Sequence, residues 1–381
     1  MTTLARPPLS AALEGCAIVI AVDRRSSELA AALERHGAQV RQAPALTIVP
    51  HIDDEALIAA TRDLVARPPD VVVATTGVGF RGWMEAADEA GLLDELHDAL
   101  SRAQIVARGP KARGAIQQAG LTADWVAESE TSSELGEFLL AEGVAGRRVA
   151  VQHHGSGADG LDELFSRAGA DVLSLTVYRW GPPADPAIVS RSVIATAQSE
   201  VDAVLFTSAP GAAEWLAAAG REGVHDDILR LSDSGRVLMA AVGPITAGPL
   251  LASGFTPLIA DRGRLGSLVR SVVTHFGAGR SPSLRTSAGR LELRSTGVVL
   301  DGRFVPLSRT GIALVAELFA ARGSVVGRPQ LQNALPRSGD SAHAVEMAIA
   351  RIRESLGVPG IIRTVVKRGY RFHVEDRDEE S

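Results

Sequence analysis

At 381 residues the chain is too long for one ordinary domain and suits two or three. Hydrophobic residues make up 46% and charged residues 22%, as in soluble globular proteins, and no apolar run approaches the ~20 residues of a membrane span. The first ten residues lack the apolar core of a signal peptide, so we expect a cytoplasmic protein without a membrane partner. Cys16 is the only cysteine, which excludes intrachain disulfides and multi-cysteine metal sites.

The net charge of −6 conceals two oppositely charged parts. Residues 281–374 carry 14 Lys and Arg against 6 Asp and Glu, whereas residues 1–280 carry 24 against 34. An acidic tail follows over 375–381. A basic module attached to an acidic one suggests nucleic acid as the partner of the basic part, although the charge alone suits any polyanion.

An internal duplication organises residues 15–270. Residues 70–77 (DVVVATTG) return as 202–209 (DAVLFTSA), and residues 36–40 return as 168–172, both at an offset of 132. The segment that begins with Gly109-Pro110 returns at Gly243-Pro244, at an offset of 134. Three repeats in the same order predict one α/β unit used twice.

Each unit has a short apolar strand, then a turn rich in Thr, Ser or Gly, then an amphipathic helix. This pattern predicts an open parallel sheet in each of two lobes. The β-rich segments Leu46–Pro50 and Leu175–Arg179 would carry the chain between the lobes twice. We therefore expect one lobe from 14–47 plus 185–277 and another from 54–174, joined by a two-stranded crossover.

The repeated turns fall at the carboxyl ends of the predicted strands, where open α/β sheets bind their ligands. Helix N-termini there offer unpaired N–H groups, which favour a ligand with many carboxylates or phosphates. Any single Ser or Thr could equally be a plain helix cap, and the sequence leaves that alternative open. The candidate ligand-binding residues are Thr75, Thr76, Gly77, Gly109, Pro110, Thr131, Ser132, Thr207, Ser208, Gly243 and Thr246.

Motifs for other kinds of chemistry are missing from the sequence. It shows no nucleophile elbow, no Gly-Lys-Ser/Thr phosphate loop and no metal-ligand spacing. We interpret the histidines, including His153-His154, as surface or structural residues, and expect no metal. Any chemistry must therefore work mainly by positioning.

Residues 14–277 contain an ordered set of short motifs: Arg24, Ile48-Val49-Pro50, Thr75-Thr76-Gly77, Gly109-Pro110, Thr131–Leu135, Val177-Tyr178, Phe206-Thr207-Ser208 and Gly243–Ala247. Taken in order, these motifs resemble the uroporphyrinogen-III synthase family. The resemblance implies two flavodoxin-like lobes and a cofactor-free reaction that closes the linear tetrapyrrole hydroxymethylbilane into uroporphyrinogen III with loss of water.

The resemblance also implies roles for single residues. Arg24 joins the substrate-binding set, and Tyr178 is the candidate to donate or relay the proton that helps the hydroxyl leave, with interface packing as its other interpretation. Holding the two ends of the substrate together would supply much of the rate. Two departures, Ala112 in place of Thr246 in the other repeat and Gln152-His153-His154 in place of a basic residue, favour binding with impaired turnover.

A segment rich in Gly, Ser and Pro follows, and we expect a flexible linker over 278–288. Beyond it we predict strands over 291–294, 298–300 and 303–307, with Asp301-Gly302 as a hairpin turn. Ser308 would cap the next helix. A short helix near 329–335, a long helix near 341–356 and a hairpin over 361–372 complete the domain.

This C-terminal part, over about 289–374, resembles the winged-helix domain of response-regulator transcription factors. The resemblance rests on Asp301-Gly302, Leu307-Ser308, the helix end at 349–357, and Arg363-Thr364-Val365 with 369–372. It implies that the long helix enters the major groove of double-stranded DNA and that the basic wing contacts phosphate or the minor groove. We assign to the helix His343, Glu346, Arg351 and Arg353, and to the backbone and wing Arg363, Thr364, Lys367 and Arg368; a solvated basic face is the alternative.

Three functions remain open at this point. The chain could be a regulator whose synthase-like region senses a tetrapyrrole precursor, a working synthase tethered to DNA, or a scaffold. Arg24, Tyr178 and Thr246 favour an intact substrate site. We expect a DNA-binding transcriptional regulator that binds and cyclises hydroxymethylbilane, with an inactive sensor as the alternative. The target sequence, the direction of regulation and a homodimer on DNA are left open.

Overall fold

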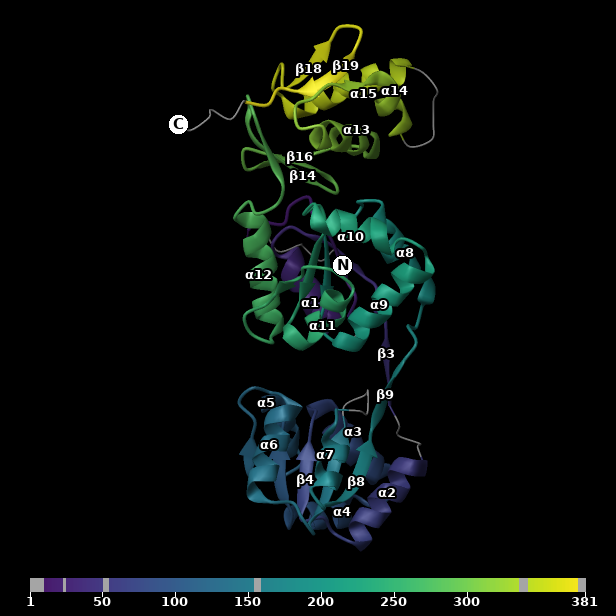
Figure 1. Cartoon of the computed structure of the whole chain (residues 1–381), viewed down its shortest axis with the longest axis vertical. Coiled ribbons are helices and arrows are strands. Elements are labelled where there is room, and N and C mark those ends of the chain that lie inside the picture. The colour runs from purple at the N-terminus through teal and green to yellow at the C-terminus, as the bar shows by residue number, and fades with distance from the viewer. Residues whose placement is uncertain (1–9, 23–24, 51–54, 154–158, 336–341, 376–381) are drawn as a thin grey trace, which may run out of the picture. The chain divides into compact units, whose positions relative to one another are not determined.

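The computed structural model describes residues 10–22, 25–50, 55–153, 159–335 and 342–375 (Figure 1). Arg24 and the tail beyond Glu375 lie outside these ranges. The chain divides into two compact units, of which one is Thr47–Pro182 and the other contains everything else. Within the described ranges no helix combines the length and apolar character that crossing a membrane requires.

The first lobe has a five-stranded parallel sheet. Two of its strands come from residues 17–42 and three from residues 203–259. Across the sheet its strands are β12 (Leu258–Ile259), β11 (Leu238–Ala241), β10 (Ala203–Phe206), β1 (Ala17–Ile20) and β2 (Gln39–Gln42). One face packs on α1 (Ser26–Glu34) and α12 (Leu265–Gly277), and the other on α8 (Pro186–Ala197), α9 (Ala209–Arg221), α10 (His225–Asp233) and α11 (Pro244–Ala252). The central strands are apolar throughout because helices cover both faces.

The second lobe repeats this design. Its sheet order is β6 (Trp125–Val126), β5 (Gln104–Ala107), β4 (Val71–Ala74), β7 (Arg148–His153) and β8 (Asp171–Thr176). One face packs on α2 (Glu55–Ala66), α3 (Gly77–Glu89), α4 (Leu93–Ser101) and α5 (Pro110–Gln118), and the other on α6 (Ser132–Glu142) and α7 (Leu161–Arg167). Position by position, β4 and β7 correspond to β10 and β1.

The duplication extends into the cores. Trp83 and Trp215, also 132 residues apart, are both fully buried. Each indole N–H donates a hydrogen bond of 3.0 Å to a hydroxyl on the neighbouring helix, Thr61 in one lobe and Ser192 in the other. Burying a tryptophan on a matched hydroxyl satisfies its one polar atom without breaking the core. The sequence analysis did not single out this pair.

Two antiparallel strands carry the chain between the lobes: β3 (Thr47–Pro50) pairs with β9 (Tyr178–Gly181). The second crossing therefore begins later than the predicted Leu175, because Leu175 and Thr176 extend β8 of the second lobe along β7. With this adjustment the structure confirms the predicted α/β class, namely two parallel-sheet lobes, a two-stranded crossover and a C-terminal winged helix.

The C-terminal part begins with a four-stranded antiparallel sheet. Its strands are β13 (Ser283–Thr286), β14 (Gly289–Arg294), β15 (Gly297–Leu300) and β16 (Arg303–Pro306). Asp301 and Gly302 both have positive φ, at 46° and 80°, as the predicted two-residue hairpin turn requires. Ser308 caps the next helix as expected, since its hydroxyl accepts a hydrogen bond of 3.1 Å from the backbone N of Gly311.

Three helices and a second sheet complete this domain. They are α13 (Arg309–Ala320), β17 (Val326–Gly327), α14 (Arg328–Asn333), α15 (Ala342–Leu356), β18 (Ile362–Val365) and β19 (Gly369–Phe372). Leu314, Val345, Ile349 and Phe372 belong to one buried core that joins α13, α15 and β19. Gly369 has a φ of 146° where its backbone lies against the Val326 carbonyl, a position without room for a Cβ.

The expected flexible linker over 278–288 is much shorter in the structure. Helix α12 continues to Gly277, β13 begins at Ser283, and Ser281 between them is buried. Arg294 of β14 explains the ordering, because its buried guanidinium lies 4.6 Å from the centre of the Phe276 ring and 2.9 Å from the Glu292 carboxylate. The Gly, Ser and Pro composition is that of a tight connection here rather than a flexible one.

Candidate functional sites

In the second lobe the predicted residues lie at helix N-termini beyond the carboxyl ends of the strands. Thr76 caps α3 by accepting from the backbone N of Gly79 at 3.1 Å, and Thr131 caps α6 by accepting from that of Glu134 at 3.3 Å. Gly109 is the N-cap of α5, with Pro110 as its first helical residue. Ser132 lies in the first turn of α6, 3.5 Å from the Asp159 carboxylate. These residues share one edge of the sheet.

The first lobe repeats the arrangement. The Ser208 hydroxyl caps α9 by accepting a hydrogen bond of 3.2 Å from the backbone N of Gly211. Thr207 beside it is half-buried. Gly243 is the N-cap of α11, with Pro244 first in the helix. Thr246 is buried in the first turn of that helix. The cap interpretation therefore holds for Thr76, Thr131 and Ser208, and ligand binding remains a prediction for the whole set.

Gln152 distinguishes the two lobes. The strand registers place it in β7 where the first lobe has Ala21 after β1. Its buried side chain accepts a hydrogen bond of 3.3 Å from the backbone N of Thr76, and its backbone carbonyl accepts one of 2.7 Å from the Thr75 hydroxyl. Thr75 is itself buried, and Gly77 packs against the backbone of Lys111. The N-terminus of α3 is thus partly satisfied from within the lobe.

Exposed cations accompany the helix N-termini, and the sequence analysis missed them. Lys111 and Arg113 lie in the first turn of α5, beside Gly109. Arg262 and Arg264 are exposed in the loop between β12 and α12, which passes next to Gly243. Positive side chains combined with unpaired helix N–H groups attract anions. The signal was present in the sequence, as basic residues directly after predicted strands.

His153 is buried, which leaves the structural one of the two interpretations given for the histidines. It is buried at the end of β7, with Nε2 2.9 Å from Asp162 and Nδ1 3.4 Å from Asp159. Burial alone would lower the pKa of His153, but the hydrogen bonds and charges of the two aspartates outweigh it and raise the pKa to about 9. The residue is a structural imidazolium, and no described group of three or more His, Cys, Asp or Glu could hold a metal ion.

Two further predicted residues can be placed only in part. Tyr178 is the first residue of β9, and its backbone pairs with Pro50 of β3. Its side chain, like the whole of Arg24, lies outside what the structure describes. Both assignments therefore stay predictions.

In the C-terminal domain, α15 and the β18–β19 hairpin expose most of the predicted DNA contacts. His343 and Arg351 are exposed on α15, and Glu346 is half-exposed, 3.1 Å from the Arg328 guanidinium. The exposed residues of the hairpin include Arg363, Thr364, Lys367 and Arg368. Lys367 adopts a φ of 63° at the tip, which turns the strand tightly and exposes the cations that follow each other there.

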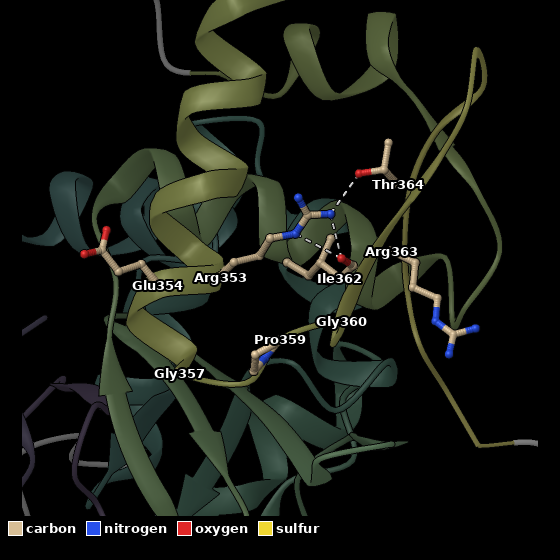
Figure 2. A pocket seen from close by; sticks show the side chains of 8 residues that line it. All are labelled: Arg353, Glu354, Gly357, Pro359, Gly360, Ile362, Arg363 and Thr364. Carbon is tan, nitrogen blue, oxygen red and sulfur yellow. Dashed lines mark hydrogen bonds between the residues drawn. The ribbon is translucent and has the colours of Figure 1, made fainter.

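Arg353 is engaged within the domain, and its predicted DNA contact stays a prediction. Its guanidinium donates hydrogen bonds of 3.0 and 2.7 Å to the Ile362 carbonyl and one of 2.9 Å to the Thr364 hydroxyl (Figure 2). It lies in a groove of about 720 Å³ between the end of α15 and β18, which Ile362, Arg363 and Thr364 of β18 also line. Arg353 is two positions from the exposed Arg351 and therefore faces another side of α15.

The fold and these sites define a bilobed α/β protein with a DNA-binding winged helix at its C-terminal end. Residues 27–270 match the family model of uroporphyrinogen-III synthase HemD, and residues 302–372 match that of the C-terminal domain of transcriptional regulatory proteins. Since the first match covers more than half of the sequence, the chain belongs to the uroporphyrinogen-III synthase family. It carries the regulator domain as a fusion.

Similar proteins cover the synthase region almost from end to end. An uncharacterized protein, YjjA, of Bacillus subtilis is 28% identical over 265 residues, which is 69% of this chain and 97% of that protein. A putative uroporphyrinogen-III synthase of Methanothermobacter thermautotrophicus is 26% identical, over 66% of this chain and 95% of its own. The structure of a mutant uroporphyrinogen III synthase from Thermus thermophilus is 29% identical, with a TM-score of 0.55, over 68% of this chain and 97% of its own.

Proposed function

We propose that the chain is a DNA-binding transcriptional regulator whose synthase region binds hydroxymethylbilane and cyclises it to uroporphyrinogen III. The observation that carries the proposal is the repeated pairing of helix N-termini with exposed cations at the carboxyl edges of the strands. Gly109 with Lys111 and Arg113 forms one such pair, and Gly243 with Arg262 and Arg264 forms the other. The match to the uroporphyrinogen-III synthase family supports hydroxymethylbilane as the ligand.

The chemistry of the substrate suits these edges. Hydroxymethylbilane carries many carboxylates, each of which can accept from backbone N–H groups or pair with Lys and Arg. Binding the carboxylates along the linear tetrapyrrole would hold its two ends together. Proximity of this kind lowers the entropic part of the activation barrier. Ring closure then needs a proton for the departing hydroxyl, which leaves as water. Tyr178 is our candidate to donate or relay it.

Gln152 supports the second candidate function, a sensor that binds the tetrapyrrole without turnover. Its side chain accepts from the backbone N of Thr76, so one donor at the N-terminus of α3 is already used. The corresponding Ala21 of the first lobe has no side chain that could do the same. Weaker binding at one lobe would lower the fraction of substrate that is held with its ends together.

Turnover separates the two functions. Enzymatically generated hydroxymethylbilane is supplied to the full chain, and the isomer ratio of the products is compared with the spontaneous background. We expect uroporphyrinogen III above that background, and a loss of at least about tenfold in rate for Tyr178→Phe if the phenol supplies the proton. Binding without isomer III would exclude the synthase and leave the sensor.

DNA binding is tested on the same full chain. Fluorescence anisotropy with mixed-sequence duplexes, with and without hydroxymethylbilane, measures affinity and its response to the ligand. A regulator should bind duplex DNA, and a tetrapyrrole-sensing regulator should change its affinity when the ligand binds, because linkage makes the two binding equilibria reciprocal. The absence of any DNA binding would exclude the regulator.

A further inference from the structure

The exposed face of α15 is apolar at its centre. Met347 is 45% exposed, and Ala350, three residues further on, is also exposed. Residues three and four apart share a helix face, so Arg351 lies beside them. The same helix buries Val345, Ile349 and Ile352 in the core, which leaves Met347 on the outward side without a structural task.

Polar and charged side chains around this centre indicate which half of the helix faces a polyanion. Arg351 lies beside it and the polar His343 one turn before it, and Lys367 and Arg368 are exposed on the neighbouring hairpin. The carboxylate of Glu346 is neutralised by Arg328 at 3.1 Å. Glu354, near the C-terminal end of α15, is also exposed. Phosphates therefore favour the half between His343 and Arg351 over the end at Glu354.

We propose that Met347 and Ala350 read thymine methyl groups in the major groove, and that they thereby determine the sequence preference of this domain. The proposal rests on the proposed DNA binding. Thymine alone among the four bases presents a methyl group there, and an apolar side chain recognises it by contact. A thioether is polarisable and adaptable, and the small Ala350 lets the helix approach the base edges closely.

The dimensions agree with this role. Three residues of α-helix rise about 4.5 Å, and B-DNA rises about 3.4 Å per base pair, so Met347 and Ala350 lie over the same or adjacent base pairs. A protein partner is a poorer occupant, because two side chains amid exposed cations offer far less apolar area than a specific protein interface of ~800 Å² per partner. Arg351 would read guanine next to the thymine contact.

The test is a double-mutant cycle between Met347 and single methyl groups of the DNA. The full chain selects binding sites from a pool of random duplexes, and each thymine of the selected site is replaced in turn by deoxyuridine, which removes only the methyl. We expect one or two replacements to weaken binding by about fourfold each, the value of one buried methyl group. In Met347→Ala the replacement opposite Met347 should change affinity by less than about twofold.

A matched control is Val325→Ala. Val325 is 39% exposed in the same domain but directly precedes β17 and is not part of α15. It should keep the full response to deoxyuridine. Binding that ignores every thymine methyl, or a response that persists unchanged in Met347→Ala, would overturn the thymine proposal while DNA binding stands. Failure to select any DNA would overturn the regulator function and the thymine proposal with it.

Discussion

Asp202 accepts hydrogen bonds from Ser295, 93 residues further along the chain. The backbone N of Ser295 lies 2.9 Å from one carboxylate oxygen, and its hydroxyl donates to the other. The same buried carboxylate accepts from the backbone N of Ala17 at 2.8 Å and from the guanidinium of Arg236 at 2.7 Å. Asp202 precedes β10 of the first lobe, and Ser295 lies in the β14–β15 turn. One carboxylate therefore joins the synthase fold to the regulator domain.

The duplication explains where this junction came from. Asp70, the counterpart of Asp202, accepts from the backbone N of Arg148 at 2.7 Å, just as Asp202 accepts from that of Ala17. Asp70 is exposed, whereas Asp202 is 1% exposed. The carboxylate thus has one role within each lobe, bonding the first backbone N–H of the neighbouring strand. In the first lobe the Asp202 carboxylate also accepts hydrogen bonds from Ser295 of the fused domain.

Asp202→Asn should destabilise the chain strongly, by about 3 kcal/mol. Replacing the buried carboxylate leaves the Arg236 guanidinium without its charged partner. An unpaired charge of this kind destabilises the folded state by more than the intact ion pair stabilised it. Urea unfolding followed by tryptophan fluorescence measures the change. Asp70→Asn is the matched control, and because Asp70 is exposed we expect it to cost less than about 1 kcal/mol. Equal losses in the two variants would show that the junction adds nothing.

Cys16 reports on the same region, because it is fully buried next to Ala17. Burial raises the pKa of the Cys16 thiol well above its usual range, and the charge of Asp202 raises it further. The thiol should therefore stay protonated and unreactive toward a disulfide reagent at pH 8, and react only when the chain unfolds. Asp202→Asn should accelerate labelling in the folded state. Rapid labelling of the unmodified native chain would contradict this placement.

Much of the fold was predictable because it is local and repeated. Val71–Ala74 and its echo at Val204–Phe206 are short apolar runs followed by helix-capping residues, and such runs form strands wherever helices cover both faces. Ser308 and Asp301-Gly302 acted as predicted because caps and hairpin turns depend on only a few neighbouring residues. The Asp202–Ser295 contact joins distant segments and leaves no periodic trace in the sequence.

The candidate sites were predictable only in outline. Thr76 and Ser208 were found because they follow strands, yet nothing local reveals that Gln152 reaches the N-terminus of α3. The hydrogen bonds of Arg353 to Ile362 could not be foreseen either, because they depend on how β18 packs against α15. Charge count identifies a basic domain, whereas tertiary packing decides which of its arginines are free to bind DNA.

The buried His153 should make stability depend on pH. Its pKa is raised to about 9 in the folded state against an ordinary value of 6.5, so its contribution is fully present below about pH 6.5 and is lost as the pH rises through 9. That contribution is at most about 3 kcal/mol. Urea unfolding of the full chain and of His153→Gln at pH 6 and 9.5 should show a larger stability difference at pH 6. Proton NMR of the His153 ring should give a midpoint near 9, and a midpoint near 6.5 would refute the assignment.

A salt titration of DNA binding should distinguish the role of the wing cations from that of Arg353. Lys367 and Arg368 are exposed at the tip of the β18–β19 hairpin, and each phosphate contact contributes a slope of ~0.9 to the plot of log affinity against log salt. The double variant Lys367→Ala/Arg368→Ala should therefore weaken DNA binding for every sequence and reduce the slope by up to about two units. Fluorescence anisotropy measures this salt dependence of the affinity. The salt concentration is varied from about 50 to about 300 mM, roughly the range in which such slopes are linear.

Arg353→Ala supplies the contrast in that experiment. Its guanidinium is occupied by the Ile362 carbonyl and the Thr364 hydroxyl, so losing it should lower the free energy of unfolding by about 1–3 kcal/mol. The salt slope should stay unchanged within error, because no phosphate contact is lost. If Arg353→Ala instead reduced the slope by about one unit at unchanged stability, the guanidinium would have to leave Ile362 on binding and contact a phosphate. The two readouts together therefore distinguish a charge that binds DNA from one that holds the recognition helix against its sheet.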